Sequence, residues 1–305
     1  MSLTLCDPGA TLTAPDLAAL PALFRAYVKE QLADPGPLPA DGDFHSFQTP
    51  GDAVSEKNGR RAGYVCLDPA RLIGVFGSHR PGECAPTVIE FDVAGLPRPD
   101  EAARKTLLDA LAARKAEGYQ KAQERAQSAW NASHADLQGH AYLVARGVLD
   151  VAHGQVRRHS SGSLVIPMRD AANMIWNRQA IAADGRKRFL DEGRLDGLGL
   201  WIPDAPMDGG DWYVVEGFAK ALAVHAATGR PTLCAFTAGN LAACLREFQA
   251  ADPSHCMIAA DNDQAGRIAA QTARAAFPMA RVLYPPDGVG DWNDIMVQQG
   301  REALA

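Results

Sequence analysis

The chain has 305 residues and a formal net charge of −6, with 47% hydrophobic and 22% charged residues. This length allows two or three domains with their own cores, and the composition is that of an ordinary globular protein. No apolar run approaches the roughly 20 residues needed to span a bilayer, and the N-terminus lacks the basic start and apolar core of a signal peptide. We therefore expect a cytoplasmic protein with no membrane partner.

The six cysteines are scattered along the chain, and no two of them are spaced as a Cys-x-x-Cys pair. Scattered cysteines are typical of proteins from a reducing compartment. We therefore expect neither a disulfide framework nor a structural zinc site.

Residues 1–95 are expected to form an N-terminal α+β domain. Residues 16–31 carry apolar side chains at helical spacing, and the Asp-Pro-Gly-Pro sequence of residues 34–37 ends that helix. Four short apolar runs separated by Gly and Pro then predict a small antiparallel sheet. These runs are residues 44–47, 63–67, 72–76 and 88–91.

Residues 96–138 are expected to form a helical connector. Their composition turns to Ala, Lys, Arg, Glu and Gln, with a short apolar stripe at one end and a nearly all-polar stretch after it. Such a pattern is typical of a long exposed helix. We assign no chemistry to it.

Residues 139–205 are expected to form a basic subdomain, with nine Lys and Arg residues against six acidic residues between positions 141 and 200. Two apolar runs, residues 162–170 and 174–180, are joined by a polar turn and predict a β-hairpin. A basic patch beside an acidic metal site would hold phosphate groups while they react. The alternative for any single arginine is a solvated surface charge.

Residues 206–305 carry three acidic groups, each placed after a short apolar run. Glu216 follows residues 212–215, Asp261 and Asp263 follow residues 256–260, and Asp291 and Asp294 follow residues 282–284. Segments of helical character lie between the runs, which predicts a parallel sheet flanked by helices. Because ligands bind at the carboxyl ends of such strands, Glu216, Asp261 and Asp263 are expected to meet there.

Carboxylates crowded in this way repel one another, and a divalent cation relieves the repulsion. Hard oxygen ligands suit Mg²⁺ or Mn²⁺, so the three groups predict a metal platform for phosphoryl transfer. A lone Asp-x-Asp is more often a turn or a helix cap. The order of all three groups within one α/β unit favours the metal site.

Residues 214–217, residues 258–263 with Gly266, and residues 291–294 together resemble the Toprim domain, which bacterial primases, topoisomerases and some nucleases share. The match is closest to the Toprim primases of conjugative plasmids and phages, which carry a Glu-Gly-Tyr-Ala-Thr-Ala motif. Residues 216–221 read Glu-Gly-Phe-Ala-Lys-Ala here. Lys220 therefore replaces the Thr of the motif and alters the charge beside the site.

The resemblance implies an α/β fold in which a C-terminal Toprim domain follows a small mixed α+β subdomain. It also implies a DNA primase that makes short RNA primers from ribonucleotides on a single-stranded DNA template. Glu216, Asp261 and Asp263 would be catalytic and would hold two Mg²⁺ or Mn²⁺ ions, with Asp291 or Asp294 assisting. Arg169 and Lys187 are the first choices for phosphate contacts. Arg178, Arg188 and Lys220 are the further candidates.

Two other functions stay open at this point. The same metal platform could cleave nucleic acid, as in Toprim nucleases, or the chain could be an inactive single-stranded DNA-binding replication module. In some Toprim enzymes the glutamate is a general acid or base, so Glu216 has two possible roles. Because the sequence ends at Ala305, soon after this region, a replicative helicase is expected to act in trans.

Overall fold

The computed structural model describes residues 18–49, 63–70, 72–78, 84, 87–91, 101–152, 154–203, 210–248, 252–286 and 291–300. The chain divides into two compact units, Met1–Ala116 and Glu117–Ala305. This division falls inside the predicted helical connector, and the domain boundaries proposed at residues 95, 138 and 205 stay predictions. Within the described ranges, no helix has both the length and the apolar character needed to cross a membrane.

The first unit contains a helix and a four-stranded antiparallel sheet, as its sequence predicts. The sheet has the strand order β1-β2-β3-β4. Its elements are α1 (Leu20–Gln31), β1 (His45–Phe47), β2 (Gly63–Asp68), β3 (Ile73–Ser78) and β4 (Thr87–Glu90). Positions 16 and 17 of the predicted helix lie outside the described residues.

Each face of this sheet is covered by a helix. Phe24 of α1 packs on one face, where its ring makes edge-to-face contacts with Phe76 at 6.2 Å and Phe91 at 5.7 Å between ring centroids. Leu111, from the first half of α2 (Glu101–Asn131), packs with Tyr64 on the other face. Alternate residues of β2 and β3 therefore supply two small cores, as the side-chain period of a strand requires.

The second unit begins with the last half of α2 and a second antiparallel sheet of order β5-β6-β7-β8. The predicted hairpin is confirmed as β6 and β7. The elements after α2 are α3 (Ala141–Ala145), η2 (Leu149–Val151), β5 (Arg157–Arg158), β6 (Leu164–Arg169), β7 (Ile175–Ile181) and β8 (Lys187–Arg188). Ile166 and Ile181 point into the main core, whereas Ile175 packs against Ala126 of α2 on the opposite face.

A mixed five-stranded sheet of order β13-β12-β10-β11-β9 completes the second unit. The predicted parallel pairing is confirmed for β10, β12 and β13. Two further strands were not predicted, namely β11, which pairs in parallel with β10, and β9, which adds an antiparallel edge. The strands are β9 (Leu200–Ile202), β10 (Trp212–Val215), β11 (Thr232–Cys234), β12 (Cys256–Ala259) and β13 (Arg281–Leu283).

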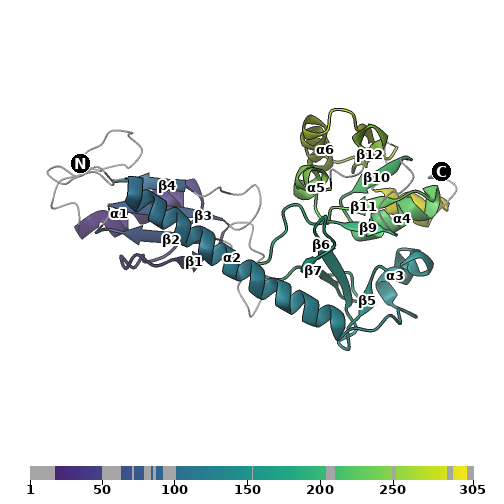
Figure 1. Cartoon of the computed structure of the whole chain (residues 1–305), viewed down its shortest axis with the longest axis horizontal. Helices are drawn as coiled ribbons and strands as arrows, with labels where there is room; N and C mark the ends of the chain where they lie inside the picture. Colours follow the sequence, from purple (N-terminus) through teal and green to yellow (C-terminus); the bar gives the residue numbers. More distant parts are fainter. Residues whose placement is uncertain are drawn as a thin grey trace. The chain divides into compact units, whose positions relative to one another are not determined.

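Helices cover both faces of this sheet (Figure 1). On one face, Phe218 and Leu222 of α4 share a core with β6 and β7, and α7 packs beside α4. On the other face, Leu241 of α5 and Ala270 of α6 pack against Ile258. The helical elements are α4 (Phe218–Thr228), η3 (Ala238–Asn240), α5 (Leu241–Glu247), η4 (Pro253–His255), α6 (Gln264–Ala276) and α7 (Trp292–Gln299).

Candidate active site

Two acidic residues follow neighbouring parallel strands in the middle of the five-stranded sheet. Strand β10 pairs with β12 in parallel, with Val214 opposite Ile258. Glu216 comes directly after β10, and Asp261 comes two residues after β12. Their side chains therefore lie at the carboxyl edge of the sheet, where parallel α/β sheets bind ligands.

Lys220, in the first turn of α4, joins these acidic residues into one cluster. Its Nζ donates a hydrogen bond to Glu216 Oε1 at 2.8 Å and another to Asp261 Oδ2, and it lies 3.7 Å from Asp291 Oδ2. The side chains are largely withdrawn from solvent, since Lys220 is 13% exposed and Asp261 10% exposed. The structure therefore brings Glu216, Asp261 and Asp291 together around one ammonium group.

The cluster shifts the pKa values of its members in opposite directions. Burial and hydrogen bonding with Glu216 raise the pKa of Asp261, and Lys220 opposes this effect. Burial also acts to raise the pKa of Glu216, but hydrogen bonding with Asp261 and Lys220 outweighs it and leaves the pKa below its usual range. The two carboxyl groups therefore titrate as one interacting pair.

Asp263 does not join this cluster through any hydrogen bond in the described structure. Its Oδ1 accepts the backbone N–H of Gly266 at 2.7 Å, which makes Asp263 the N-cap of α6. An Asp at this position stabilises a helix because it satisfies an orphan donor of the first turn. Its negative charge still acts on Glu216, whose pKa it tends to raise.

Asp291 and Asp294 cap the start of α7 reciprocally. Asp294 Oδ2 accepts the N–H of Asp291 at 3.2 Å, and Asp291 Oδ1 accepts the N–H of Asp294 at 2.9 Å. Asp291 also faces Lys220, whereas Asp294 lies 3.7 Å from Arg146 Nη1. Of the two, only Asp291 belongs to the acidic cluster.

Arg146 and Asn293 are residues of this region that the sequence analysis did not single out. Asn293 is fully buried, accepts from Arg146 Nη1 at 3.3 Å and donates through Nδ2 to the Arg146 carbonyl at 2.9 Å. Next to it, Trp292 Nε1 donates to the carbonyl of Ala260 at 3.0 Å. These bonds tie α7 to the end of β12 and to the residue that follows α3.

The carboxylate oxygens of the cluster are suitable ligands for a divalent cation, although they are not arranged as a complete metal site. Asp261 Oδ1 is buried and receives no hydrogen bond within the described residues, so it is an oxygen that a cation could satisfy. Among those same residues, however, no three His, Cys, Asp or Glu side chains form a group that could hold a metal ion. The carboxylates are instead gathered by Lys220.

The β5–β8 sheet separates the predicted basic residues into two groups. Lys187 lies opposite Ile181, whose side chain points into the core beneath α4. Burial lowers the pKa of Lys187, and the charges of Lys220, Arg146 and Glu216 all act on it. Lys187 therefore lies on the same side of the sheet as the acidic cluster.

Arg169, Arg178 and Arg188 belong to the other face. Arg169 lies opposite Ile175 and its guanidinium lies 5.8 Å from the ring centroid of Trp130 in α2. Arg178 lies opposite Pro167 and lines a hollow beside α2. Arg188 lies opposite Ala180, two residues after Arg178 on β7. The structure does not bring these three arginines to the acidic cluster.

Residues 211–302 match the family model of the Toprim domain. This chain carries a Toprim domain. The resemblance to Toprim primases is confirmed by a DNA primase TraC of Escherichia coli, which is 30% identical over 266 residues, or 80% of this chain. A second Escherichia coli DNA primase TraC is 31% identical over 169 residues. The chain spans only 24% of the length of the first relative and 12% of the second.

Solved primase structures are also similar to this chain, at lower identity. The primase fragment of the bacteriophage T7 primase-helicase protein is 18% identical with a TM-score of 0.43, over 53% of this chain and 71% of its own. The Aquifex aeolicus primase, with zinc-binding and RNA polymerase domains, is 14% identical with a TM-score of 0.46, over 95% and 83% of the two chains.

Proposed function

We propose that this chain is a DNA primase that joins ribonucleotides into short primers on single-stranded DNA. The observation that carries the proposal is the gathering of Glu216, Asp261 and Asp291 at the carboxyl edge of a Toprim sheet. The similarity to the DNA primases TraC of Escherichia coli supports the same activity. Because its cysteines are free thiols wherever the structure describes them, we place the protein in the reducing cytoplasm.

Glu216 and Asp261 would hold Mg²⁺ or Mn²⁺, with Asp291 assisting and Asp263 adding negative charge. Bound cations would supply charge neutralisation at the phosphates and a lower pKa of the attacking 3′-hydroxyl. Lys220 would release the carboxylates and turn its ammonium toward a phosphate oxygen. Lys187, on the same side of the sheet, would add a second positive charge.

A primer-synthesis assay on a mixed-sequence single-stranded template tests this function. Labelled ribonucleotides are supplied with Mg²⁺, with Mn²⁺ or with EDTA, and the products are separated by length. We expect short RNA products with a divalent cation and none in EDTA. Cleavage of labelled template without nucleotides would instead indicate a nuclease. DNA binding without synthesis or cleavage would indicate an inactive binding module.

The relatives that this chain matches are several times its length. We propose that the chain cooperates with a replicative helicase. An increase in primer yield on adding such a helicase to the same assay would support this partnership, and an unchanged yield would contradict it.

A further inference from the structure

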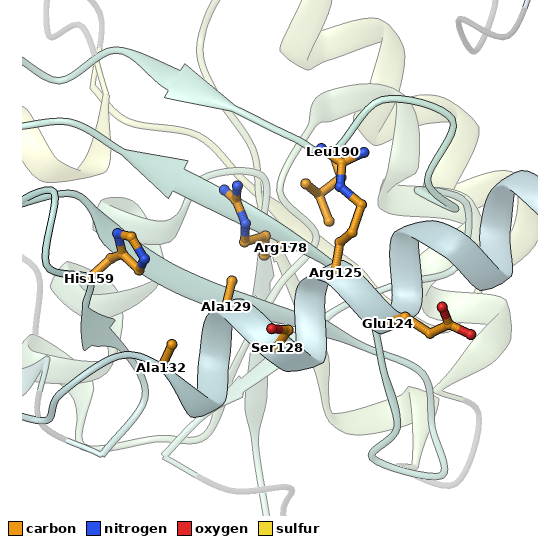
Figure 2. A pocket seen from close by; sticks show the side chains of 8 residues that line it. All are labelled: Glu124, Arg125, Ser128, Ala129, Ala132, His159, Arg178 and Leu190. Carbon is orange, nitrogen blue, oxygen red and sulfur yellow. The ribbon is translucent and has the colours of Figure 1, made fainter.

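A second cationic site lies on the face of the β5–β8 sheet that carries Arg178, away from the acidic cluster. It is a hollow of about 480 Å³ between α2 and β7, within the roughly 300–1,000 Å³ usual for ligand sites. Its lining residues are Glu124, Arg125, Ser128, Ala129, Ala132, His159, Arg178 and Leu190. Figure 2 shows Arg125 and Ser128 rising from α2, with Arg178 and His159 coming from the sheet side.

Arg178 is the residue that marks the hollow as a binding site. Its Nε is buried and has no hydrogen-bond partner within the described residues. Burial lowers the pKa of Arg178, and the neighbouring positive charge of Arg125 lowers it further. A partly buried guanidinium beside a second guanidinium is costly unless an anion pairs with both.

Two other arginines on this face have hydrogen-bond acceptors for their guanidinium groups. Arg157 donates to the carbonyl of Trp130 at 3.0 Å and lies 4.2 Å from the centroid of its ring. Arg169 donates to the carbonyl of Asn173 at 2.7 Å and lies near the same ring. Both therefore have structural roles. Arg178 and Arg125 have no such acceptor among the described residues, so their donors are available to a ligand.

His159 and Ser128 add further donors around the same hollow. His159 Nδ1 accepts the backbone N–H of Ser161 at 3.2 Å, so the ring carries its proton on Nε2, which is then a donor. The one carboxylate of the lining, Glu124, extends away from the two guanidinium groups (Figure 2). Two guanidinium forks, an imidazole N–H and a hydroxyl suit the oxygens of a phosphate.

We propose that Arg125, Arg178 and His159 hold a backbone phosphate of single-stranded nucleic acid, as a second anchor apart from the acidic cluster. The hollow is open to solvent along the exposed residues Glu124, Arg125 and Ser128, as passage of a continuous strand requires. Arg188, on the same face, extends the positive surface. The identity of the ligand rests on the proposed function, but binding at this anchor needs no metal.

Binding of a fluorescent single-stranded oligonucleotide to the full chain, measured by anisotropy in EDTA across a salt series, tests the anchor. Arg125→Glu changes an exposed helix position, and Arg178→Gln removes the charge of a partly buried side chain. We expect each variant to bind about three- to tenfold more weakly, with the slope of log K against log salt shallower by about 0.7. Arg274→Glu, an equal charge change on the exposed surface of α6, is the matched control and should leave both quantities unchanged.

Competition by inorganic phosphate and by a nucleoside triphosphate distinguishes a strand from a free nucleotide. Weaker triphosphate binding by Arg125→Glu, with unchanged oligonucleotide binding, would overturn the strand anchor and assign the hollow to a nucleotide. Unchanged binding of all three probes by Arg125→Glu would overturn the site altogether. Weaker oligonucleotide binding by Arg125→Glu would support the anchor even if the wild-type protein made no primers. Failure of the anchor and failure of the proposed function therefore give different results.

Discussion

Lys220 and Asp261 form an ion pair across the carboxyl edge of the Toprim sheet, and the same ammonium also binds Glu216. The pair joins the first turn of α4 to the end of β12. Because the ammonium group already donates to one oxygen of each carboxylate, a divalent cation would have to compete with Lys220 for these oxygens. The residue that departs from the family motif therefore lies where it would lower the affinity of the cluster for a cation.

Lys220→Thr, which restores the residue of the family motif, should make the fold depend more on a divalent cation. Without the ammonium, Glu216 and Asp261 repel each other, and we expect a loss of about 1–3 kcal/mol of unfolding free energy in EDTA. Mg²⁺ should recover most of it, because a ligand that binds only the folded state stabilises that state. Thermal unfolding of wild type and variant, each with EDTA and with Mg²⁺, measures the effect.

Lys121→Thr is the control for this change, since Lys121 pairs with Glu117 at the same i,i+4 spacing on an exposed helix face. Its thermal unfolding should respond to Mg²⁺ as the wild type does. If Mg²⁺ raised the unfolding temperature of wild type and Lys220→Thr by the same amount, the ammonium group and the cation would not compete.

Asp261→Asn should abolish primer synthesis while the protein still folds. Asparagine keeps the size of the side chain but removes the negative charge that would bind a cation, and we expect activity to fall at least about a hundredfold. Primer synthesis and circular dichroism are measured on the same preparation. Asp184→Asn, at an exposed position that pairs with Arg186, should keep full activity. A fully active Asp261→Asn would reject the assignment.

The arrangement of the Toprim sheet could be predicted from sequence because each strand is marked by a short run of neighbouring residues. Each apolar run that ends in an acidic residue indicates a strand, and parallel strands bring Glu216 and Asp261 to one edge. Strand β11 was not predicted, because three residues after Pro231 give little periodicity to detect. The role of Asp263 as an N-cap also depends on residues close together in the sequence, since its partner Gly266 lies three residues later.

The division of the basic residues could not be predicted, because it depends on strand register. A shift of one residue moves a side chain to the opposite face of a sheet. The irregularity between Met168 and Arg169 places Arg169 opposite Ile175 on the α2 face, and the pairing of β8 places Lys187 opposite Ile181 on the other. Neither register is encoded in the spacing of charges along the chain.

Gly266→Ala should disturb the acidic cluster through backbone contact. A Cβ at position 266 would lie 2.5 Å from the carbonyl oxygen of Asp261, which the fixed backbone cannot accommodate. We expect a loss of about 1–3 kcal/mol of unfolding free energy and weaker primer synthesis, because Asp261 must move. Gly239→Ala, where no atom lies within 4 Å of the added Cβ, is the control. Chemical denaturation distinguishes them, and equal stability of the two variants would refute the contact.

Asn293→Ala should detach α7 from Arg146. Truncation leaves the partly buried Arg146 carbonyl without its donor, which costs about 1–3 kcal/mol. Because Asp291 precedes Asn293 by two residues, we also expect weaker primer synthesis. Gln298→Ala, at an exposed position of the same helix, should change neither quantity. If Asn293→Ala unfolded at the same denaturant concentration as Gln298→Ala, the proposed tie would be absent.

Buried thiols should make the fold less stable in alkali. Burial raises the pKa of Cys66 to about 11 and that of Cys234 to about 12. In the unfolded chain these thiols ionise near pH 8.5, so above that pH the unfolded state binds fewer protons than the folded state and stability falls as pH rises. Urea unfolding from pH 8 to 10.5 should show a falling midpoint. Cys234→Ala with Cys66→Ala should flatten that fall, and an equally steep fall would contradict the linkage.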